Sequence, residues 1–318
     1  MKIVLLEPLG ISEKKLSALV RPFLDAGHAF VAMPESSEKA DWLREAKDAD
    51  VVVIGNKPLP GEFISQCEKL KFISVAFTGF DHIDIEQCRK QGIAVSNASG
   101  YANTAVAETT IGLMISTMRR FKETEERCRT GGTKDGLVGP LLAGKTVGVI
   151  GTGAIGSAVI KLLNAFGCRV LGYSPSEKSP EEVRRVGYEK VSLEQLLAES
   201  DVVTLHCPLN DSTRGMIGAN ELASMKDGAY LFNLARGPVV DSQALAVALN
   251  SGKLAGAGVD VYEIEPPLPV DHPLLKAKNI VTLPHIAWYS HQSLELRAEI
   301  AFDNVREWMA GCQQNKVI

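Results

Sequence analysis

The sequence has 318 residues, which is more than one ordinary hydrophobic core holds and is enough for two domains. Hydrophobic residues make up 45% of the chain and charged residues 23%, values that are ordinary for a soluble globular protein. The formal net charge of -4 leaves no basic footprint for nucleic acid or for an anionic membrane surface, so neither partner is expected.

The cysteines and the N-terminus indicate the compartment. The six cysteines form no C-x-x-C pair, and no Cys/His cluster has the spacing of metal ligands, so we expect no metal. Most of them lie in apolar or helical stretches, as buried free thiols in a reducing compartment do. The apolar start of the chain is too short for a signal peptide, and no apolar run approaches the roughly 18 residues that span a bilayer. A cytoplasmic protein is expected.

Short apolar runs alternate with amphipathic segments along the whole chain. The runs are rich in Val and Ile, lack period-2 alternation and are bounded by Gly, Pro, Asp or Asn, which is typical of strands buried on both faces of a parallel sheet. Helical patterns lie between them, so the fold class is α/β. The expected strands are 2–6, 50–54, 72–75, 93–95, 146–150, 169–173, 202–206, 229–233, 255–260 and 280–282.

These strands form two β-α series, the first of which fills roughly residues 1–97. A long helix follows, which is expected to start at the capping pair Asn103-Thr104 and to run to about Arg127. No low-complexity linker separates the two series, so this helix is expected to make the crossing. The last helix, about residues 291–310, has no strand after it, and its economical place is back on the first domain.

The strongest local motif is Gly151-Thr-Gly153-Ala-Ile-Gly156, directly after an apolar strand and directly before a helical pattern. Gly151 allows the tight turn, Gly153 lets a pyrophosphate approach the backbone, and Gly156 permits close packing of helix on strand. The positive end of the helix then meets the phosphate charge. The motif predicts a dinucleotide cofactor, NAD or NADP.

The end of the second strand of this series bears on the choice between the two cofactors. An acid there would bind the ribose hydroxyls and repel a 2′-phosphate, but this chain has Ser174, followed by Pro175-Ser176-Glu177-Lys178. We expect NAD to be somewhat favoured and NADPH to be accepted as well. Lys178 either reaches a 2′-phosphate or is a solvated loop lysine beside Glu177.

Three further segments place chemically useful side chains at strand ends, where open α/β sheets bind ligands. They contribute Arg236, Glu265 and His285. A histidine suits proton transfer near neutral pH, a carboxylate beside it favours its protonated form, and an arginine holds a carboxylate through its rigid fork of donors. Taken singly, the three fit a surface ion pair, a loop acid and a core histidine. Together they predict hydride transfer between a nicotinamide and carbon 2 of a small 2-hydroxy or 2-oxo acid.

At this point the chain resembles a known family, the D-isomer-specific 2-hydroxyacid dehydrogenases, over essentially its whole length. The matching pieces are Thr78–Asp84, Ala107-Glu108, Gly151–Gly156, His206–Leu209 with Thr213, Asn233–Gly237, Val259–Pro267 and Pro284–Trp288.

The resemblance implies roles for individual residues. Arg236 is the expected substrate clamp, His285 the acid/base and Glu265 its partner, so these three are the expected catalytic residues. Asp260 is expected near the nicotinamide carboxamide. Beyond the glycine loop and Ser174, the other residues expected at the cofactor are Thr104, Ala154, Ile155, Cys207, Pro208, Thr213, Leu234 and Ala235. Those expected at the substrate, beside Arg236 and His285, are Asn56, Lys57, Thr78 and Gly79, the last two through their backbone, and Trp288.

The resemblance also implies the domain organisation. Residues 1–99 and 287–318 would form a discontinuous flavodoxin-like substrate domain, and residues 100–286 a Rossmann coenzyme domain inserted in it. The family implies a homodimer in which the coenzyme domains pack through the helix that starts near Asn103.

Within the family, Gly55-Asn56-Lys57 and His285–Trp288 most resemble the glycerate dehydrogenase (hydroxypyruvate reductase) branch. The expected substrate is therefore D-glycerate/hydroxypyruvate or glyoxylate, with a D-lactate-type or other D-2-hydroxyacid dehydrogenase as the alternative. Lys57 either adds a positive charge near a small polar acid or is a solvated loop lysine. An alternative of another class is a corepressor-like binding protein that senses NAD.

Overall fold

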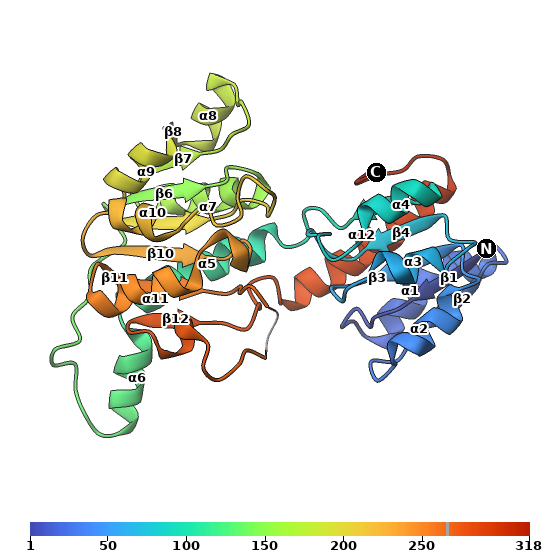
Figure 1. Ribbon diagram of the computed structural model, residues 1–318, viewed down its shortest axis with the longest axis horizontal. Coiled ribbons are helices and arrows are strands. Elements are labelled where there is room, and N and C mark those ends of the chain that lie inside the picture. Colours follow the sequence, from blue (N-terminus) through green and yellow to red (C-terminus); the bar gives the residue numbers. More distant parts are fainter. Residues whose placement is uncertain (265–266) are drawn as a thin grey trace. The chain divides into compact units, whose positions relative to one another are not determined.

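The computed structural model describes residues 1–264 and 267–318, and the chain divides into two compact units. Unit 1 contains Met1–Ala102 and Tyr289–Ile318, so it is built from both ends of the chain, whereas unit 2 is the continuous segment Asn103–Trp288. Each unit consists of a parallel sheet with helices packed against it (Figure 1).

Unit 1 has a five-stranded parallel sheet in the order β2-β1-β3-β4-β5. The order reverses between β1 and β3, which makes this a doubly wound, flavodoxin-like sheet with a switch point at the carboxyl ends of those two strands. Every residue of β3 and β4 is buried, as the unbroken apolar runs predicted. The strands are β1 (Lys2–Leu5), β2 (Ala29–Ala32), β3 (Val51–Ile54), β4 (Phe72–Val75) and β5 (Ala94–Asn97).

The helices of unit 1 include the last helix of the chain, which packs against this sheet. Its residues Phe302 and Val305 share one core with β1, β3 and the first helix, and Trp308 stacks on Phe72 with ring centroids 4.9 Å apart. The helices are α1 (Glu13–Asp25), α2 (Lys39–Ala46), α3 (Gly61–Ser65), α4 (Ile85–Gln91) and α12 (His291–Met309).

Unit 2 has a seven-stranded parallel sheet in the order β12-β11-β10-β9-β6-β7-β8. Its order reverses between β6 and β9, the arrangement of a dinucleotide-binding Rossmann sheet. Two doubly wound parallel sheets confirm the predicted fold class. The strands are β6 (Thr146–Ile150), β7 (Arg169–Tyr173), β8 (Glu189–Lys190), β9 (Val202–Leu205), β10 (Ala229–Asn233), β11 (Leu254–Val259) and β12 (Ile280–Thr282).

The helices of unit 2 form two layers. One layer contains α5, which packs along α7 and against β10, β11 and β12; the other contains α9, α10 and α11, whose leucines share a core with β9 and β10. The helices are α5 (Asn103–Met118), α6 (Phe121–Arg129), α7 (Ala154–Ala165), α8 (Pro180–Val186), α9 (Leu193–Glu199), α10 (Ala219–Ser224) and α11 (Ser242–Ser251), with 3₁₀ turns η1 (Gly237–Val239) and η2 (Pro273–Lys276).

The prediction of one long helix from Asn103 to about Arg127 is wrong. The helix ends at Met118, Arg120 takes a left-handed conformation with φ 54°, and α6 begins at the next residue. The returning chain explains the break, because a Cβ on Gly139 would lie only 1.9 Å from the carbonyl oxygen of Met118. Neither Gly nor Pro occurs at the break, so the local sequence carries no signal for it.

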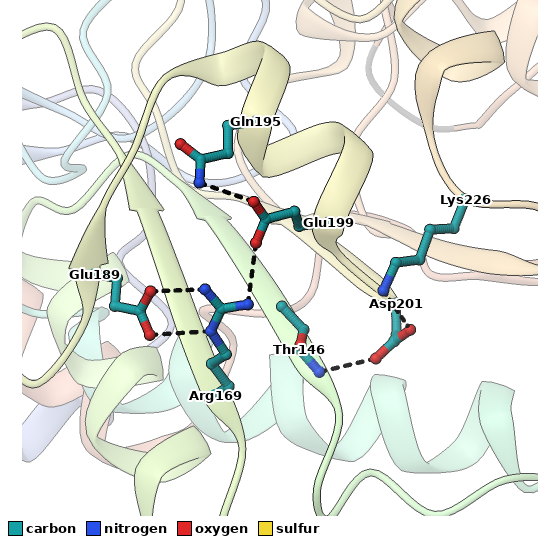
Figure 2. Close-up of polar contacts among 7 residues, drawn as sticks. All are labelled: Thr146, Arg169, Glu189, Gln195, Glu199, Asp201 and Lys226. Carbon is teal, nitrogen blue, oxygen red and sulfur yellow. Dashed lines mark hydrogen bonds and ion pairs between the residues drawn. The ribbon is translucent and has the colours of Figure 1, made fainter.

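The sequence also missed the two edge strands β2 and β8. Strand β8 consists only of Glu189 and Lys190, both exposed, so no apolar pattern marks it. Ion pairs hold this edge instead (Figure 2). The guanidinium of Arg169 on β7 donates at 2.7 and 3.0 Å to the two carboxylate oxygens of Glu189 and at 3.0 Å to Glu199. The hydrogen bonds that Arg169 donates to these two acids raise its pKa.

At the amino-terminal edge of the same sheet, the Asp201 carboxylate joins two elements (Figure 2). It accepts the backbone N–H of Thr146 at 2.9 Å and the ammonium of Lys226 at 3.0 Å. Burial favours the neutral acid, but these two donors outweigh it and lower the pKa of Asp201. The start of β6 is thereby fixed at the edge opposite to the glycine loop.

Three cysteines are buried, Cys67, Cys88 and Cys207, and all six are free. The expectation of buried thiols fails for Cys128 and Cys312, which are exposed because they lie in α6 and after the last helix. Within the described ranges, no group of three His, Cys, Asp or Glu side chains could hold a metal ion. None of the described helices combines the length and apolar character needed to cross a membrane.

Candidate active site

The carboxyl edge of unit 2 carries the predicted chemical residues on adjacent strands. Strands β10, β11 and β12 are neighbours in the sheet, and they are followed by Arg236, Asp260 and His285 respectively. The glycine loop follows β6 at the same edge, because all these strands are parallel. The three residues and the loop therefore belong to one edge of one sheet.

The glycine loop packs directly on the exit of β9. Gly151 has φ 94°, and a Cβ there would lie 2.6 Å from the backbone nitrogen of Cys207 and from the carbonyl carbon of His206. A Cβ on Gly156 would lie 1.9 Å from the carbonyl oxygen of Gly151. The sequence motif predicted both requirements, a tight turn and a close helix–strand approach.

The second glycine of the motif, Gly153, meets no such constraint. Nothing lies within 4 Å of where a Cβ on Gly153 would be, and Gly153 and Ala154 are exposed. Gly153 caps α7, and neither a capping side chain nor an acidic residue occupies the first turn of that helix. This turn, which includes Ile155, thus has no side-chain cap among the described residues, and such a helix N-terminus fits the pyrophosphate of a dinucleotide.

At the end of β7, Ser174 is half-buried and its hydroxyl lies 2.9 Å from that of Ser176. Lys178 pairs with Glu182 of α8 and not with the adjacent Glu177. The β7 end thus carries two hydroxyls and a cation, Lys178, that already pairs with an acid of the following helix.

The exit of β9 is ordered by its own side chains. The Thr213 hydroxyl accepts the N–H of Asn210 at 2.9 Å and donates to the carbonyl of Pro208 at 2.7 Å, so it holds this loop in place. Burial raises the pKa of the Cys207 thiol to about 11. Nε2 of His206 lies 2.9 Å from the Thr204 hydroxyl, and burial lowers the pKa of this ring to about 3.

A buried asparagine that the sequence reasoning left without a role presents Arg236. The Asn233 side chain accepts the N–H of Ala235 at 3.1 Å and donates to the carbonyl of Arg236 at 3.0 Å, which closes a turn at the strand end. Leu234 and Ala235 are buried, whereas Arg236 is half-buried. A Cβ on the next residue, Gly237, would lie 1.8 Å from the carbonyl carbon of Tyr262, so only glycine fits there.

Asp260 holds the turn that presents His285. The carboxylate is 1% exposed, and its two oxygens accept the backbone N–H of Ile286 at 2.7 Å and of Ala287 at 2.9 Å. His285 has φ 58°, a conformation that costs energy for a non-glycine residue, so the turn needs such support.

Other predicted residues lie as follows. Glu265 lies outside the described residues. His285 and Trp288 are half-buried, and Thr104 is exposed in the first turn of α5. Pro208 is exposed.

The predicted substrate residues of unit 1 follow the neighbouring strands β3 and β4. Asn56 is half-buried, and Lys57 is exposed with its ammonium 5.2 Å from the Trp42 ring centroid. Lys57 is therefore placed by a cation–π contact, which neither sequence alternative included. Its backbone N–H donates to the buried carboxylate of Glu7 at 3.0 Å.

The loop after β4 contains hydrogen-bond donors that have no acceptor among the described residues. The Thr78 hydroxyl is buried and has no hydrogen-bond partner among the described residues. The N–H groups of Thr78 and Gly79 donate to no acceptor in the described part of the chain either. The Thr78 carbonyl, by contrast, accepts the Asn97 side chain at 2.7 Å, which fixes the loop. Three unused donors side by side fit an anion such as a carboxylate.

Comparison with known proteins identifies the family. The family model for the NAD binding domain of D-isomer specific 2-hydroxyacid dehydrogenases matches residues 111–287. A glyoxylate reductase of Thermofilum pendens is 40% identical over 281 residues, which cover 84% of this chain and 83% of that protein. A hydroxypyruvate reductase of Blautia hydrogenotrophica is 36% identical over 277 residues, which cover 85% of each chain.

Solved structures agree with the sequence comparisons. A glyoxylate reductase from Paecilomyes thermophila matches with a TM-score of 0.90 and 30% identity, over 100% of this chain and 98% of that one. A D-lactate dehydrogenase from Aquifex aeolicus, solved with NAD and lactic acid, matches with a TM-score of 0.84 and 31% identity, over 97% and 96%. The chain belongs to the D-isomer specific 2-hydroxyacid dehydrogenase family, oxidoreductases that act on CH–OH groups with a nicotinamide cofactor.

Proposed function

We propose that this enzyme interconverts hydroxypyruvate and D-glycerate, or reduces glyoxylate, with Arg236 as substrate clamp and His285 as acid/base. The observation that carries the proposal is the delivery of Arg236, Asp260 and His285 to one sheet edge by three adjacent strands, beside an open helix N-terminus. Ligands of open α/β sheets bind at such an edge.

Arg236 would hold the substrate carboxylate and polarise the 2-oxo group. Its planar fork can donate to two oxygens at once, and the Asn233 turn fixes the backbone from which it extends. In unit 1, the Thr78 hydroxyl and the N–H groups of Thr78 and Gly79 are the proposed donors to a substrate carboxylate.

His285 would donate the proton to the substrate oxygen during reduction and remove it during oxidation. Asp260 supports this role by fixing the backbone that follows His285, because its carboxylate accepts the N–H groups of Ile286 and Ala287. Glu265 is proposed, from its place in the sequence, as the acid that favours the protonated imidazole. Trp288, Asn56 and Lys57 are the further proposed substrate-binding residues.

The dinucleotide would lie on the glycine loop at the switch point between β6 and β9. When bound, its nicotinamide supplies or accepts the hydride. Gly151, Gly153 and Gly156 shape the loop, and the open first turn of α7 would receive the pyrophosphate. The further proposed contacts are Thr104, Ala154, Ile155, Ser174, Cys207, Pro208, Thr213, Leu234, Ala235 and Asp260.

We propose dual cofactor use with NADH favoured. Ser174 removes the negative charge that would repel a 2′-phosphate, which supports NADPH binding. The nearest cation, Lys178, already pairs with Glu182, so a 2′-phosphate would have to displace an existing partner. This competition supports a preference for NADH.

The substrate proposal rests on residues and relatives. Asn56 and Lys57 place a polar amide and a cation at the end of β3, which suits a small acid with a polar or absent side chain. Relatives named glyoxylate reductase and hydroxypyruvate reductase support the same choice. A D-lactate-type activity is the alternative, and the similarity to the Aquifex aeolicus structure keeps it in the test.

We also propose a homodimer formed through unit 2 and a cytoplasmic location. Helix α6 has no buried residue, and Phe121, Val138 and Leu141 are exposed apolar side chains in and after it. A second copy of the chain would cover them. Six free cysteines support a reducing compartment.

The test is a screen of hydroxypyruvate, glyoxylate and pyruvate with NADH and with NADPH, followed at the absorbance of the reduced nicotinamide. We expect kcat/KM to be highest for hydroxypyruvate or glyoxylate and higher with NADH than with NADPH. A maximum for pyruvate would select the D-lactate alternative. Binding of NADH without turnover of any 2-oxo acid would refute the proposal and favour an NAD-sensing binding protein.

A further inference from the structure

The two loops of unit 1 that carry proposed substrate residues are joined to each other. Strands β3 and β4 are neighbours, and their exit loops contain Asn56 and Lys57 in one case and Thr78 and Gly79 in the other. The geometry of a small-acid site depends on the spacing of these loops, because a misplacement of about 1 Å weakens several contacts at once.

Backbone hydrogen bonds make one connection between the loops. Leu59 forms an isolated parallel bridge with Ile83. The N–H of Leu59 donates to the carbonyl of His82 at 2.9 Å, and the N–H of Asp84 donates to the carbonyl of Leu59 at 3.2 Å. This connection lies on the far side of each loop from the substrate residues, so by itself it leaves residues 55–57 unsupported.

The side chain of His82 makes the second connection. Its Nε2 lies 3.0 Å from the carbonyl oxygen of Gly55. A carbonyl only accepts hydrogen bonds, so Nε2 carries the proton and donates. His82 is half-buried, and its ring therefore links the loop after β4 to the residue directly before Asn56.

Glu7 holds the same segment from the other end. Its buried carboxylate accepts the N–H of Lys57 at 3.0 Å, and a Cβ on Gly55 would lie 3.0 Å from the same oxygen. Asn56 is thus bracketed by His82 on its amino side and by Glu7 on its carboxyl side. Glu7 follows β1 and the loop follows β3, so the bracket stands at the switch point of the sheet.

We propose that His82 is a positioning residue of the substrate site, which sets the spacing between the Asn56–Lys57 loop and the Thr78–Gly79 loop without touching the substrate. This inference rests on the proposed function, since it concerns the same 2-oxo acid site. Loss of the His82 donor would loosen residues 55–57, whereas the glycine loop and α7 belong to unit 2 and keep their geometry.

The closing experiment compares three variants in the full-length protein. His82→Leu removes the donor, and His82→Gln restores an amide donor at a similar reach from the backbone. His28→Leu is the matched control, a half-buried histidine of the same unit whose ring contacts only the N-terminal amino group among the described residues. Steady-state kinetics are measured with the best 2-oxo acid and with NADH.

We expect His82→Leu to raise KM for the 2-oxo acid about tenfold, with a change below about threefold in KM for NADH. A tenfold change corresponds to about 1.4 kcal/mol, the size of one hydrogen bond to an uncharged acceptor. His82→Gln should recover most of the loss and His28→Leu should show none. An unchanged KM in His82→Leu, or equal losses in the Leu and Gln variants, would overturn the proposal.

Hydrogen exchange supplies a readout that does not need catalysis. Amides of residues 55–59 should exchange at least tenfold faster in His82→Leu than in the parent protein, and those of residues 151–160 should be unchanged. Unchanged protection of residues 55–59 would overturn the coupling even in a protein that reduces no 2-oxo acid. Absence of 2-oxo acid turnover with faster exchange in this loop would refute the proposed function and retain the coupling between loops.

Discussion

The proposed role of Arg236 as substrate clamp depends on the geometry of its guanidinium as well as on its charge. Lysine keeps the positive charge but cannot present two parallel donors, so Arg236→Lys should lower kcat/KM for the 2-oxo acid roughly a hundredfold, or about 3 kcal/mol. The matched control is Arg169→Lys, because Arg169 also binds a carboxylate through two nitrogens but does so with Glu189 at the sheet edge. Steady-state kinetics decide, and a loss within threefold for Arg236→Lys would remove the clamp role.

The Thr78 hydroxyl is a buried donor without a partner among the described residues, and the substrate is its proposed partner. Thr78→Val keeps the shape and removes the donor. We expect KM for the 2-oxo acid to rise about tenfold, from the loss of a hydrogen bond to a charged group, with thermal stability unchanged or slightly higher. Thr117→Val is the control, since the Thr117 hydroxyl is equally buried and also lacks a partner among the described residues, but lies in α5. Equal KM values in the two variants would contradict the assignment.

His206 makes the stability of the fold depend on pH. Its pKa is about 3 in the folded protein and 6.5 in an ordinary chain, so the ring is neutral in both states above pH 6.5 and contributes no pH dependence there. Between pH 6.5 and 3 the unfolded chain binds a proton that the folded protein does not, and the free energy of unfolding falls by up to about 1.4 kcal/mol per pH unit. His206→Gln should flatten this decline in urea unfolding between pH 6 and 4. A decline as steep as in the parent protein would show that other groups cause it.

At the scale of elements, two glycines of the loop before and within α7 should have different roles. Gly156 is needed for folding, and Gly153 is needed for cofactor binding. Gly156→Ala would push a methyl group into the Gly151 carbonyl, so it should destabilise the protein by about 1–3 kcal/mol. Gly153→Ala meets open space at an ordinary φ of -68°, so stability should be kept. The added methyl would instead obstruct the pyrophosphate, and the Kd for NADH should rise at least tenfold. Thermal unfolding and fluorescence titration of both variants test this contrast, which is lost if Gly153→Ala binds NADH normally.

The elements also show what the sequence could predict. The central strands were found within about two residues because burial on both faces demands unbroken apolar runs, as in β3 and β10. The edge strand β8 was missed because ion pairs of Arg169 hold it. The break at Arg120 was missed because its cause, the approach of Gly139, lies 19 residues further along the chain.

In the candidate site, too, residues with a recognisable local pattern were predicted, and residues that act through contacts with distant parts of the chain were missed. Arg236 and His285 were placed at strand ends from their chemistry, and Asp260 near the cofactor from the family resemblance. The structure has the three residues directly after the neighbouring strands β10, β12 and β11, whereas Glu265 lies outside the described residues. The supporting residues Asn233 and His82 were assigned no role, because an amide or a ring that binds a backbone carbonyl leaves no pattern in the sequence. Such support depends on which loops the fold brings together.

At the scale of the whole molecule, both units use the same device. Each is a doubly wound parallel sheet, and in each some of the proposed ligand residues follow the two strands between which the strand order reverses. Unit 1 places Lys57 and Glu7 there, and unit 2 places Gly151 and Cys207 there. We propose that unit 1 recognises the substrate and that unit 2 binds the cofactor. Both functions would thus use the same type of sheet.

Association is the last property of the whole molecule that the structure lets us predict. In Figure 1, α6 and the chain after it extend away from the sheet of unit 2, and no residue of α6 is buried. Val138 is 94% exposed and Leu141 64%, which is costly for apolar side chains unless a partner covers them. We expect a dimer in solution, because a stable interface of about 800 Å² per partner needs such an apolar centre.

The test measures the sedimentation of the parent protein, of a variant with two introduced charges and of a control variant with one. Val138→Glu with Leu141→Glu should convert the dimer to a monomer, since burying two carboxylates in an interface is strongly unfavourable. Val247→Glu is the control, because Val247 is also exposed, at 58%, but lies on α11. A parent protein that sediments as a monomer would contradict the proposed dimer. A dimer that survives the double substitution would place the interface elsewhere and leave the exposed residues after α6 without an occupant.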